Sequence, residues 1–501
     1  MYAAVAFCLR GLFVAVPVIS IDEAVWMTGA RIWTGGGVPY LDFVDTKPPV
    51  IFAFYALTAW MGELAIPALR VLCILLLVLS ASMADRIVAL LSARPVSGVP
   101  AGLLLLLGLT LGMERQTQFV STELVCACLF MGSLWLIATA GPGAHLRLAL
   151  AGALAILIPF TRIPAAVLGL PLAAVLVVCG ELRSLAVRLL LFVSGGAVAL
   201  VLLLTLMGDA GALREMVFWS WTANQLYVDV GPSAAVSARR FLSNVAPAFA
   251  ITLPLWALAG ASILRQQGKA RWISAALLAA AMLSLAAAAA GGRWLGHYYL
   301  QVIPPLVLVA ALAPGQERLR AVATAIVAAG ALVFTGVGFW RLHLAENTRE
   351  TRVEVAEAVR FVRDRTRETD RMLVWGYGPD FYERSGRRPA TRHLTPATTV
   401  TGYSFGGAKD FASRMNPQAL VLPERWAQFM NDLRCTPPAM IVDFSRYDFH
   451  YFGGFGFEHY PELNEWVETS CTEAASDGKA ARSFRFLECH ATPEPERCRK
   501  K

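Results

Sequence analysis

The chain has 501 residues, of which 56% are hydrophobic and 16% are charged, and its mean hydropathy is +0.54. This composition excludes an ordinary water-soluble protein and is typical of a polytopic membrane protein. The net charge is +8, but residues 1–340 hold only 20 of the 44 Lys and Arg and 13 of the 36 Asp and Glu. We therefore predict a transmembrane module over residues 1–340 and a soluble α/β domain over residues 341–501.

Eleven apolar segments approach the length of about 20 residues that a membrane-spanning helix needs. The first has no small-residue cleavage site and is expected to be a retained span, not a signal peptide. The run Val50–Met61 is too short to span and is predicted to form a helix in the membrane interface. The predicted spans are Ala3–Ile19, Leu64–Ala84, Val99–Met113, Thr122–Ala140, Leu148–Phe160, Pro164–Cys179, Leu185–Met207, Val245–Leu264, Ile273–Ala290, Tyr298–Ala313 and Ala321–Trp340.

The loops between these spans differ in charge. Alternate loops carry ten Lys and Arg against three acidic residues, and the positive-inside rule places those loops in the cytoplasm. The N-terminus is then inside, while the loop over residues 20–63 and the C-terminal domain lie outside. Four cysteines of that domain agree with an oxidising compartment, although the sequence does not give their pairing. They are Cys435, Cys471, Cys489 and Cys498.

The first outer loop concentrates charged residues beside a membrane span, which usually marks a functional polar site. Further polar residues lie on the same side of the predicted topology. The loop contains Asp22, Glu23, Arg31, Asp42, Asp45 and Lys47, and the others are Arg115, Glu123, Arg162, Arg293 and His297.

These groups suit a transfer from a lipid phosphate, in which a carboxylate takes the acceptor's hydroxyl proton and cations stabilise the departing phosphate. Asp22 and Glu23 are neighbours, so their side chains diverge. We expect Asp22 to be the base, and Glu23 to bind the acceptor, a cation or Arg31. The alternative is that the pair only caps a helix N-terminus. No phosphate-binding loop of the Gly-x-x-x-x-Gly-Lys-Ser/Thr type is present, so ATP hydrolysis is not supported.

The C-terminal third alternates between helical and strand patterns, which favours a small layer of helices and sheet. Two aromatic segments, Phe218–Val228 and Phe444–Leu463, suit either sugar stacking, contact with a membrane surface or packing on their own domain. The predicted helices are Glu424–Leu433, Glu462–Thr469 and one with Val355, Val359 and Val362 on its face; the predicted strands are Met372–Trp375, Met440–Asp443 and Phe484–Leu487.

The first loop resembles that of the GT-C glycosyltransferases that use polyprenyl-phosphate sugars, such as protein O-mannosyltransferases and lipid A aminoarabinose transferases. The resemblance rests on Asp22-Glu23, Gly37 to Tyr40, Asp42, Asp45 and Lys47-Pro48-Pro49, and it continues in Gly62, Arg70, Arg115 to Glu123, Thr161-Arg162, His297-Tyr298-Tyr299 and Pro304.

The resemblance implies that Asp22 is the catalytic base and that Lys47 meets the lipid phosphate. Arg115, Arg162, Arg293, His297 and Tyr298 are assigned to the same phosphate; Glu23, Arg31, Tyr40, Asp42 and Asp45 are assigned to the acceptor or to support of the site. In the aminoarabinose branch a Glu directly before the Lys has been linked to a bound cation. Thr46 stands there in this chain, so we expect no metal and no other cofactor.

We therefore predict an inverting transferase of the bacterial inner membrane with its active site in the periplasm. Its donor would be an undecaprenyl-phosphate sugar, and its acceptor a glycan, glycolipid or protein of the cell envelope; its partners would be membrane lipids and no nucleic acid. The alternatives are a flippase for lipid-linked sugars, an O-antigen ligase or oligosaccharide transferase with pyrophosphate-linked donors, and a noncatalytic scaffold. A flippase would place charges at the bilayer midplane, whereas here they gather at one surface.

Overall fold

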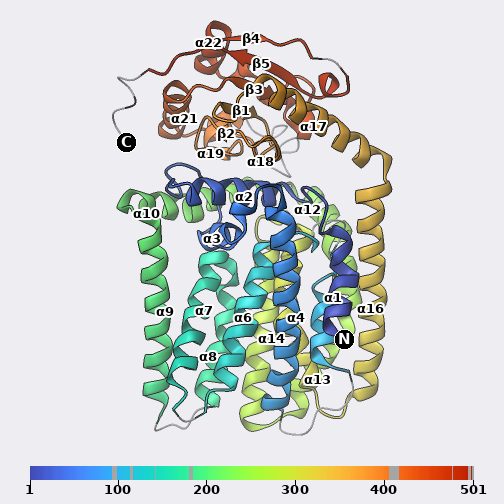
Figure 1. The fold of residues 1–501 in the computed structure, drawn as a ribbon. Coiled ribbons are helices and arrows are strands. Elements are labelled where there is room, and N and C mark those ends of the chain that lie inside the picture. The colour runs from blue at the N-terminus through green and yellow to red at the C-terminus, as the bar shows by residue number, and fades with distance from the viewer. Residues whose placement is uncertain are drawn as a thin grey trace.

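The computed structural model describes the whole chain except residues 93–98, 113–116, 142, 180–183, 405–416, 477, 495–497 and 499–501. It has two layers, a bundle of long helices and, beyond one end of that bundle, a layer of helices and strands (Figure 1). Each layer has its own hydrophobic core. One core runs from Ala6 to Leu342 with Leu394 added, and the other runs from Val355 to Cys489.

The helices of the bundle are rich in Leu, Ala and Val. In lipid an α-helix is favoured because all its backbone N–H and C=O groups form hydrogen bonds within the same segment. Each of the eleven predicted spans contains a helix. Among the described residues, five helices are long and apolar enough to cross a membrane, and five more apolar helices are shorter. The polytopic class is therefore confirmed, while the number eleven stays a prediction. The helices are α1 (Tyr2–Arg10), α4 (Ala65–Leu91), α5 (Ala101–Gly108), α6 (Thr122–Ala138), α7 (His145–Thr161), α8 (Gly169–Val178), α9 (Leu185–Met207), α13 (Ala246–Arg265), α14 (Gly268–Ala289), α15 (Ile303–Ala311) and α16 (Glu317–Phe339).

Short helices lie between the bundle and the second layer, where α2, α10 and α12 run across the end of the bundle (Figure 1). The predicted interfacial segment forms α3 and a 3-10 turn, Ala59–Leu64, with Trp60 79% exposed. Such an exposed indole suits the headgroup level of a bilayer. These helices are α2 (Ile21–Thr34), α3 (Val50–Ala56), α10 (Ala210–Val217), α11 (Ala223–Asp229) and α12 (Ala234–Arg240).

The second layer is built on a five-stranded sheet with the order β2-β1-β3-β5-β4. Strand β1 pairs in parallel with β2 and β3, and β5 is antiparallel to β3 and β4. All the helices and strands predicted after residue 345 form at the expected positions. The elements are α17 (Glu346–Arg365), β1 (Arg371–Trp375), α18 (Asp380–Ser385), β2 (Arg388–Pro389), α19 (Thr398–Thr401), α21 (Pro423–Cys435), β3 (Met440–Asp443), α22 (Pro461–Ser470), β4 (Cys471–Glu473) and β5 (Arg485–Cys489).

The four cysteines of this layer form two disulfides, Cys435–Cys498 and Cys471–Cys489. The second joins opposite residues of β4 and β5. The expectation of paired cysteines is confirmed, and it agrees with an oxidising compartment.

Ion pairs and backbone bonds connect the two layers. Arg31 at the end of α2 lies 2.6 Å from Glu383 of α18, and Arg425 of α21 lies 2.6 Å from Glu215 of α10. The backbone N–H of Val44 donates to the carbonyl of Arg392 at 2.9 Å. The first outer loop is therefore held against the sheet layer on more than one side.

Candidate active site

The first turn of α2 places two neighbouring carboxylates in opposite directions. Ser20 caps the helix, and Glu23 completes a capping box by accepting from the backbone N–H groups of Ile19 and Ser20. Glu23 is fully buried and also receives two hydrogen bonds from Arg70, at 2.6 and 3.0 Å. Of the three partners predicted for Glu23, the acceptor, a cation or Arg31, the contact with Arg31 is wrong, because Arg31 pairs with Glu383 and Glu23 with Arg70. The alternative that the carboxylate caps the helix is confirmed for Glu23. Asp22 faces the other way, into a cavity.

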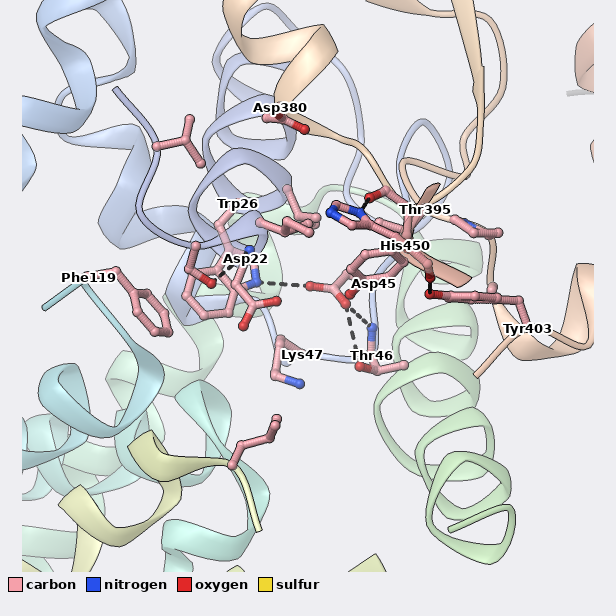
Figure 2. Close-up of a pocket in the computed structure, with 18 of the residues that line it drawn as sticks. Asp22, Trp26, Asp45, Thr46, Lys47, Phe119, Asp380, Thr395, Tyr403 and His450 are labelled. Atoms are coloured by element: carbon pink, nitrogen blue, oxygen red, sulfur yellow. Dashed lines mark hydrogen bonds between the residues drawn. The ribbon is translucent and has the colours of Figure 1, made fainter. Parts of the chain in front are cut away.

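This cavity has a volume of about 510 Å³ and is lined by residues of the membrane module and of the sheet layer. Its lining from residues 1–340 includes Asp22, Trp26, Asp45, Lys47, Phe119, His297 and Tyr298. Figure 2 shows Asp22, Asp45 and Lys47 around the same space. Five of the predicted site residues, Asp22, Asp45, Lys47, His297 and Tyr298, are thus brought together.

Hydrogen bonds fix the loop that carries Asp45 and Lys47. The indole N–H of Trp26 donates to Asp45 Oδ2 at 3.0 Å, and the backbone N–H of Thr46 donates to Asp45 Oδ1 at 2.6 Å. Tyr40 donates its hydroxyl to the carbonyl of Lys47 at 2.6 Å and has a backbone φ of +66°, which is uncommon for a bulky residue. Tyr40 is therefore a support of the Lys47 backbone and does not line the cavity.

Burial and neighbouring charges shift the pKa values of Asp22 and Lys47, which both line the cavity. Burial raises the pKa of Asp22 to about 6; Lys47 opposes this rise, while Asp45 adds to it. Burial alone would lower the pKa of Lys47, but attraction by Asp45, Tyr298 and Asp22 outweighs it and leaves the pKa of Lys47 above its ordinary value. Near neutral pH the cavity thus holds a permanent ammonium beside a carboxylate that exchanges its proton close to that pH.

The loop before Lys47 does not fit a divalent cation. Thr46, directly before Lys47, supplies a hydroxyl and no carboxylate, and both oxygens of Asp45 already accept hydrogen bonds from Trp26 and Thr46. Lys47 is a strong electrostatic partner of Asp45, so a cation placed there would meet a like charge.

Arg162 lies one side chain away from the cavity. Its guanidinium is 2.7 Å from Glu123, donates to Gln301 at 3.2 Å and stacks 4.5 Å from the ring centroid of Tyr298, which does line the cavity. Arg162 itself does not line the cavity and reaches it only through its contact with Tyr298, so its role at a donor phosphate stays a prediction.

Other predicted site residues have structural partners outside the cavity lining. Arg293 donates to the carbonyls of Tyr227 and Val230 and to Ser404, so it joins loops instead of facing the cavity. Arg31 binds Glu383, and Asp42 accepts from the backbone N–H of Val38 at 2.7 Å. Arg115 lies outside the described residues.

The sheet layer forms the roof of the cavity, which the sequence did not indicate. The charged roof residues are Arg352, Asp380 and Arg384, from α17 and α18, and the aromatic ones include Tyr377, Tyr403 and His450. His450 belongs to the aromatic segment Phe444–Leu463, and Tyr377 to the Gly-rich turn after β1. Their aromatic and glycine content was the available signal, but no pattern linked them to Asp22.

The fold is similar to those of solved glycosyltransferases. ArnT from Cupriavidus metallidurans bound to undecaprenyl phosphate aligns with a TM-score of 0.57 and 15% identity over 98% of both chains. This similarity shows that the two chains share an overall fold. The same protein in its apo state gives a TM-score of 0.55. The oligosaccharyltransferase of Archaeoglobus fulgidus in its apo form aligns with a TM-score of 0.53 and 12% identity, over 94% of this chain and 72% of that one. No protein-family model and no curated protein sequence matches the chain.

Proposed function

We propose that this chain is an inverting glycosyltransferase that moves one sugar from a polyprenyl-phosphate donor, such as undecaprenyl phosphate, to an acceptor outside the membrane. The observation that carries this proposal is that one cavity, at the end of the membrane helices, is lined by both the Asp22 carboxylate and the Lys47 ammonium. The GT-C fold adds support, since ArnT with the same fold was solved with undecaprenyl phosphate bound.

In the proposed reaction Asp22 accepts the proton of an acceptor hydroxyl as its oxygen attacks the anomeric carbon. The bond between that carbon and the phosphate oxygen breaks, and the phosphate keeps the electron pair. Lys47 stabilises the extra negative charge on the phosphate, with His297 and Tyr298 beside it. Attack from the face opposite the phosphate inverts the anomeric centre. A base with a pKa of about 6 is matched to this task near neutral pH.

Arg162 has a positioning role in this proposal. Its stacking on Tyr298 and its ion pair with Glu123 fix the wall beneath the phosphate and bring a positive charge near it without direct contact. The acceptor would be an envelope glycan, glycolipid or protein, reached from the periplasmic side of a bacterial inner membrane.

A second candidate is an oligosaccharide transferase with a pyrophosphate-linked donor. The fold similarity to the Archaeoglobus fulgidus oligosaccharyltransferase favours it. It predicts that the purified protein neither binds nor uses monophosphate lipids.

The test measures binding of undecaprenyl phosphate to the purified chain in nanodiscs by native mass spectrometry. Lys47→Met is expected to weaken binding by about tenfold or more, because a charge-assisted hydrogen bond to phosphate is lost. Lys479→Met, at an exposed site of the sheet layer, is the matched control and is expected to bind as the unmodified chain does. Mass spectrometry of envelope glycans from cells with and without the protein then identifies the sugar. Equal binding by the Lys47→Met variant would refute the assignment of Lys47.

A further inference from the structure

The roof of the cavity holds an arginine whose charge is not paired. Arg384, in the last turn of α18, lines the cavity and is partly exposed. Its guanidinium makes no hydrogen bond and no ion pair with any of the residues that the structure describes. By contrast, the nearby Arg31 of α2 pairs with Glu383 at 2.6 Å. The guanidinium of Arg384 is therefore able to donate its N–H groups to an anion that enters the cavity.

The charges around Arg384 leave its positive charge partly uncompensated. Burial lowers the pKa of the Arg384 guanidinium; Asp380, one turn earlier in α18, opposes this shift, and Arg363 adds to it. Asp380 lines the cavity, but so does Arg352 of α17, and the roof thus has two guanidinium groups and one carboxylate. The lining residues of the first outer loop show the opposite balance, two carboxylates and one ammonium. The part of the cavity with an excess of positive charge is therefore the roof.

The roof lies where the body of an acceptor is expected. In Figure 2, Asp22 lies between Lys47 and Asp380. An acceptor hydroxyl has to reach Asp22 and attack the sugar from the face opposite the phosphate, which is proposed to bind beside Lys47. The rest of the acceptor then extends from Asp22 toward the roof, where α18 carries Asp380 and Arg384. Arg384 is therefore placed to meet a group of the acceptor, while Lys47 meets the donor.

Apolar side chains line the cavity on the same helices as the charged roof residues. Helices α2 and α17 both pack against α18, and α17 follows the membrane helix α16 after one π-helical turn. Positive charge next to apolar surface at the end of membrane helices suits an amphipathic ligand with an anionic headgroup. The apolar lining residues of α17, α18 and the segment that leads into α2 are Pro17, Val18, Ile21, Val355 and Phe381.

We propose that Arg384, with Arg352 as the second positive charge of the roof, binds a phosphate group of the acceptor. The acceptor is then an anionic molecule, such as a phospholipid or a phosphorylated glycolipid, whose hydroxyl reaches Asp22 while its phosphate stays at the roof. This inference rests on the proposed function and names the acceptor class. A guanidinium forms charge-assisted and often bidentate hydrogen bonds with a phosphate, so a neutral acceptor of similar size should bind more weakly.

The test measures lipid binding to the purified full-length chain in detergent micelles by native mass spectrometry. The anionic probe is phosphatidylglycerol, whose headgroup joins a phosphate to free hydroxyls, and the neutral probe is diglucosyl diacylglycerol. Phosphatidylglycerol is expected to bind about tenfold or more tightly than the neutral lipid. Arg384→Gln should remove about tenfold of this affinity, and Arg384→Lys, which keeps the charge, should lose less. The matched control, Arg360→Gln, alters an exposed arginine of α17 outside the lining and should bind both lipids as the unmodified chain does.

Undecaprenyl phosphate, measured on the same samples, separates this inference from the function on which it rests. Arg384→Gln should keep its affinity for undecaprenyl phosphate, which also shows that the variant is folded. If the neutral lipid binds the unmodified chain as tightly as phosphatidylglycerol, or if Arg384→Gln keeps the preference, the roof assignment is wrong and the proposed donor site stands. If soluble sn-glycerol 3-phosphate competes at the same concentration as phosphatidylglycerol, the phosphate site stands but a lipid source is refuted. If the unmodified chain does not bind undecaprenyl phosphate, the proposed function fails.

Discussion

The divergence of Asp22 and Glu23 gives the sharpest prediction. Asp22→Asn and Glu23→Gln are the same change, carboxylate to amide, at adjacent positions, yet their effects should be opposite. Asp22→Asn is expected to remove transfer activity, by a factor of about 10²–10⁴ for a lost general base, and to leave the protein folded. Glu23→Gln is expected to leave the reacting groups in place and to destabilise the protein.

The magnitudes follow from the environments of the two side chains. The pKa of Asp22 rises from 3.8 to about 6 in the folded state. At 1.36 kcal/mol per pKa unit, the ionised carboxylate costs the native state roughly 3 kcal/mol above pH 6, an upper bound because Asp22 keeps some solvent contact. This cost is absent below pH 4, where the group is protonated in both states, and an amide never incurs it. Asp22→Asn should therefore be at least as stable as the unmodified chain at pH 8.

Glu23 presents the opposite case, because it and Arg70 are 0% and 3% exposed in a pair that is 2.6 Å apart. Removing one partner of a buried ion pair costs about 3–5 kcal/mol, since the other charge stays buried without compensation. The assay is the apparent unfolding temperature of each variant in nanodiscs at pH 8, followed by intrinsic fluorescence, with sugar transfer measured on the same samples. An Asp22→Asn variant with full activity, or a Glu23→Gln variant that is stable but inactive, would refute the reasoning.

Two further predictions concern pH and the disulfides. The proposed base, Asp22, acts as a carboxylate, and its pKa is raised to about 6. The transfer rate should therefore fall about tenfold per pH unit below pH 6 and level off above pH 7. A rate that is constant between pH 5 and 8 would contradict the role of Asp22. Replacing both Cys471 and Cys489 by Ala removes a disulfide that spans 18 residues, and the free energy of unfolding of the sheet layer should fall by about 3 kcal/mol. The expected result is faster proteolysis of the sheet layer while the membrane helices stay protected. Unchanged protease resistance would show that the β4–β5 pair is stable without the disulfide.

Local sequence was enough to predict the elements and the centre of the cavity. Asp22 and Lys47 belong to the same outer segment, residues 20–63, at the start of α2 and directly before α3, so their proximity depends mainly on contacts within that segment. The presence of disulfides, though not their pairing, and the strands around Met372 and Met440 were also predicted from composition and periodicity. These features depend on residues close in the chain or on strong compositional signals.

The partners of the arginines and the roof of the cavity depend on contacts between distant residues. Arg162 and Arg293 were placed on the expected side, but no sequence pattern reveals that Glu123 lies 2.7 Å from the first or that the carbonyl of Tyr227 accepts from the second. His450 reaches the cavity only because the sheet layer folds back over residues 44–47. The sequence shows which charged side chains are present, but only the tertiary structure shows which of them already have an ion-pair or hydrogen-bond partner.

Helix α2 connects the proposed base to the roof of the cavity. Its first turn holds Asp22 and its last turn holds Arg31, whose partner Glu383 lies in α18, one turn after the roof residue Asp380. A helix of 14 residues is a rigid rod of about 20 Å, so it transmits displacement of one end to the other. Any displacement of α18 would therefore be carried through the Arg31–Glu383 pair to the Asp22 end of this helix.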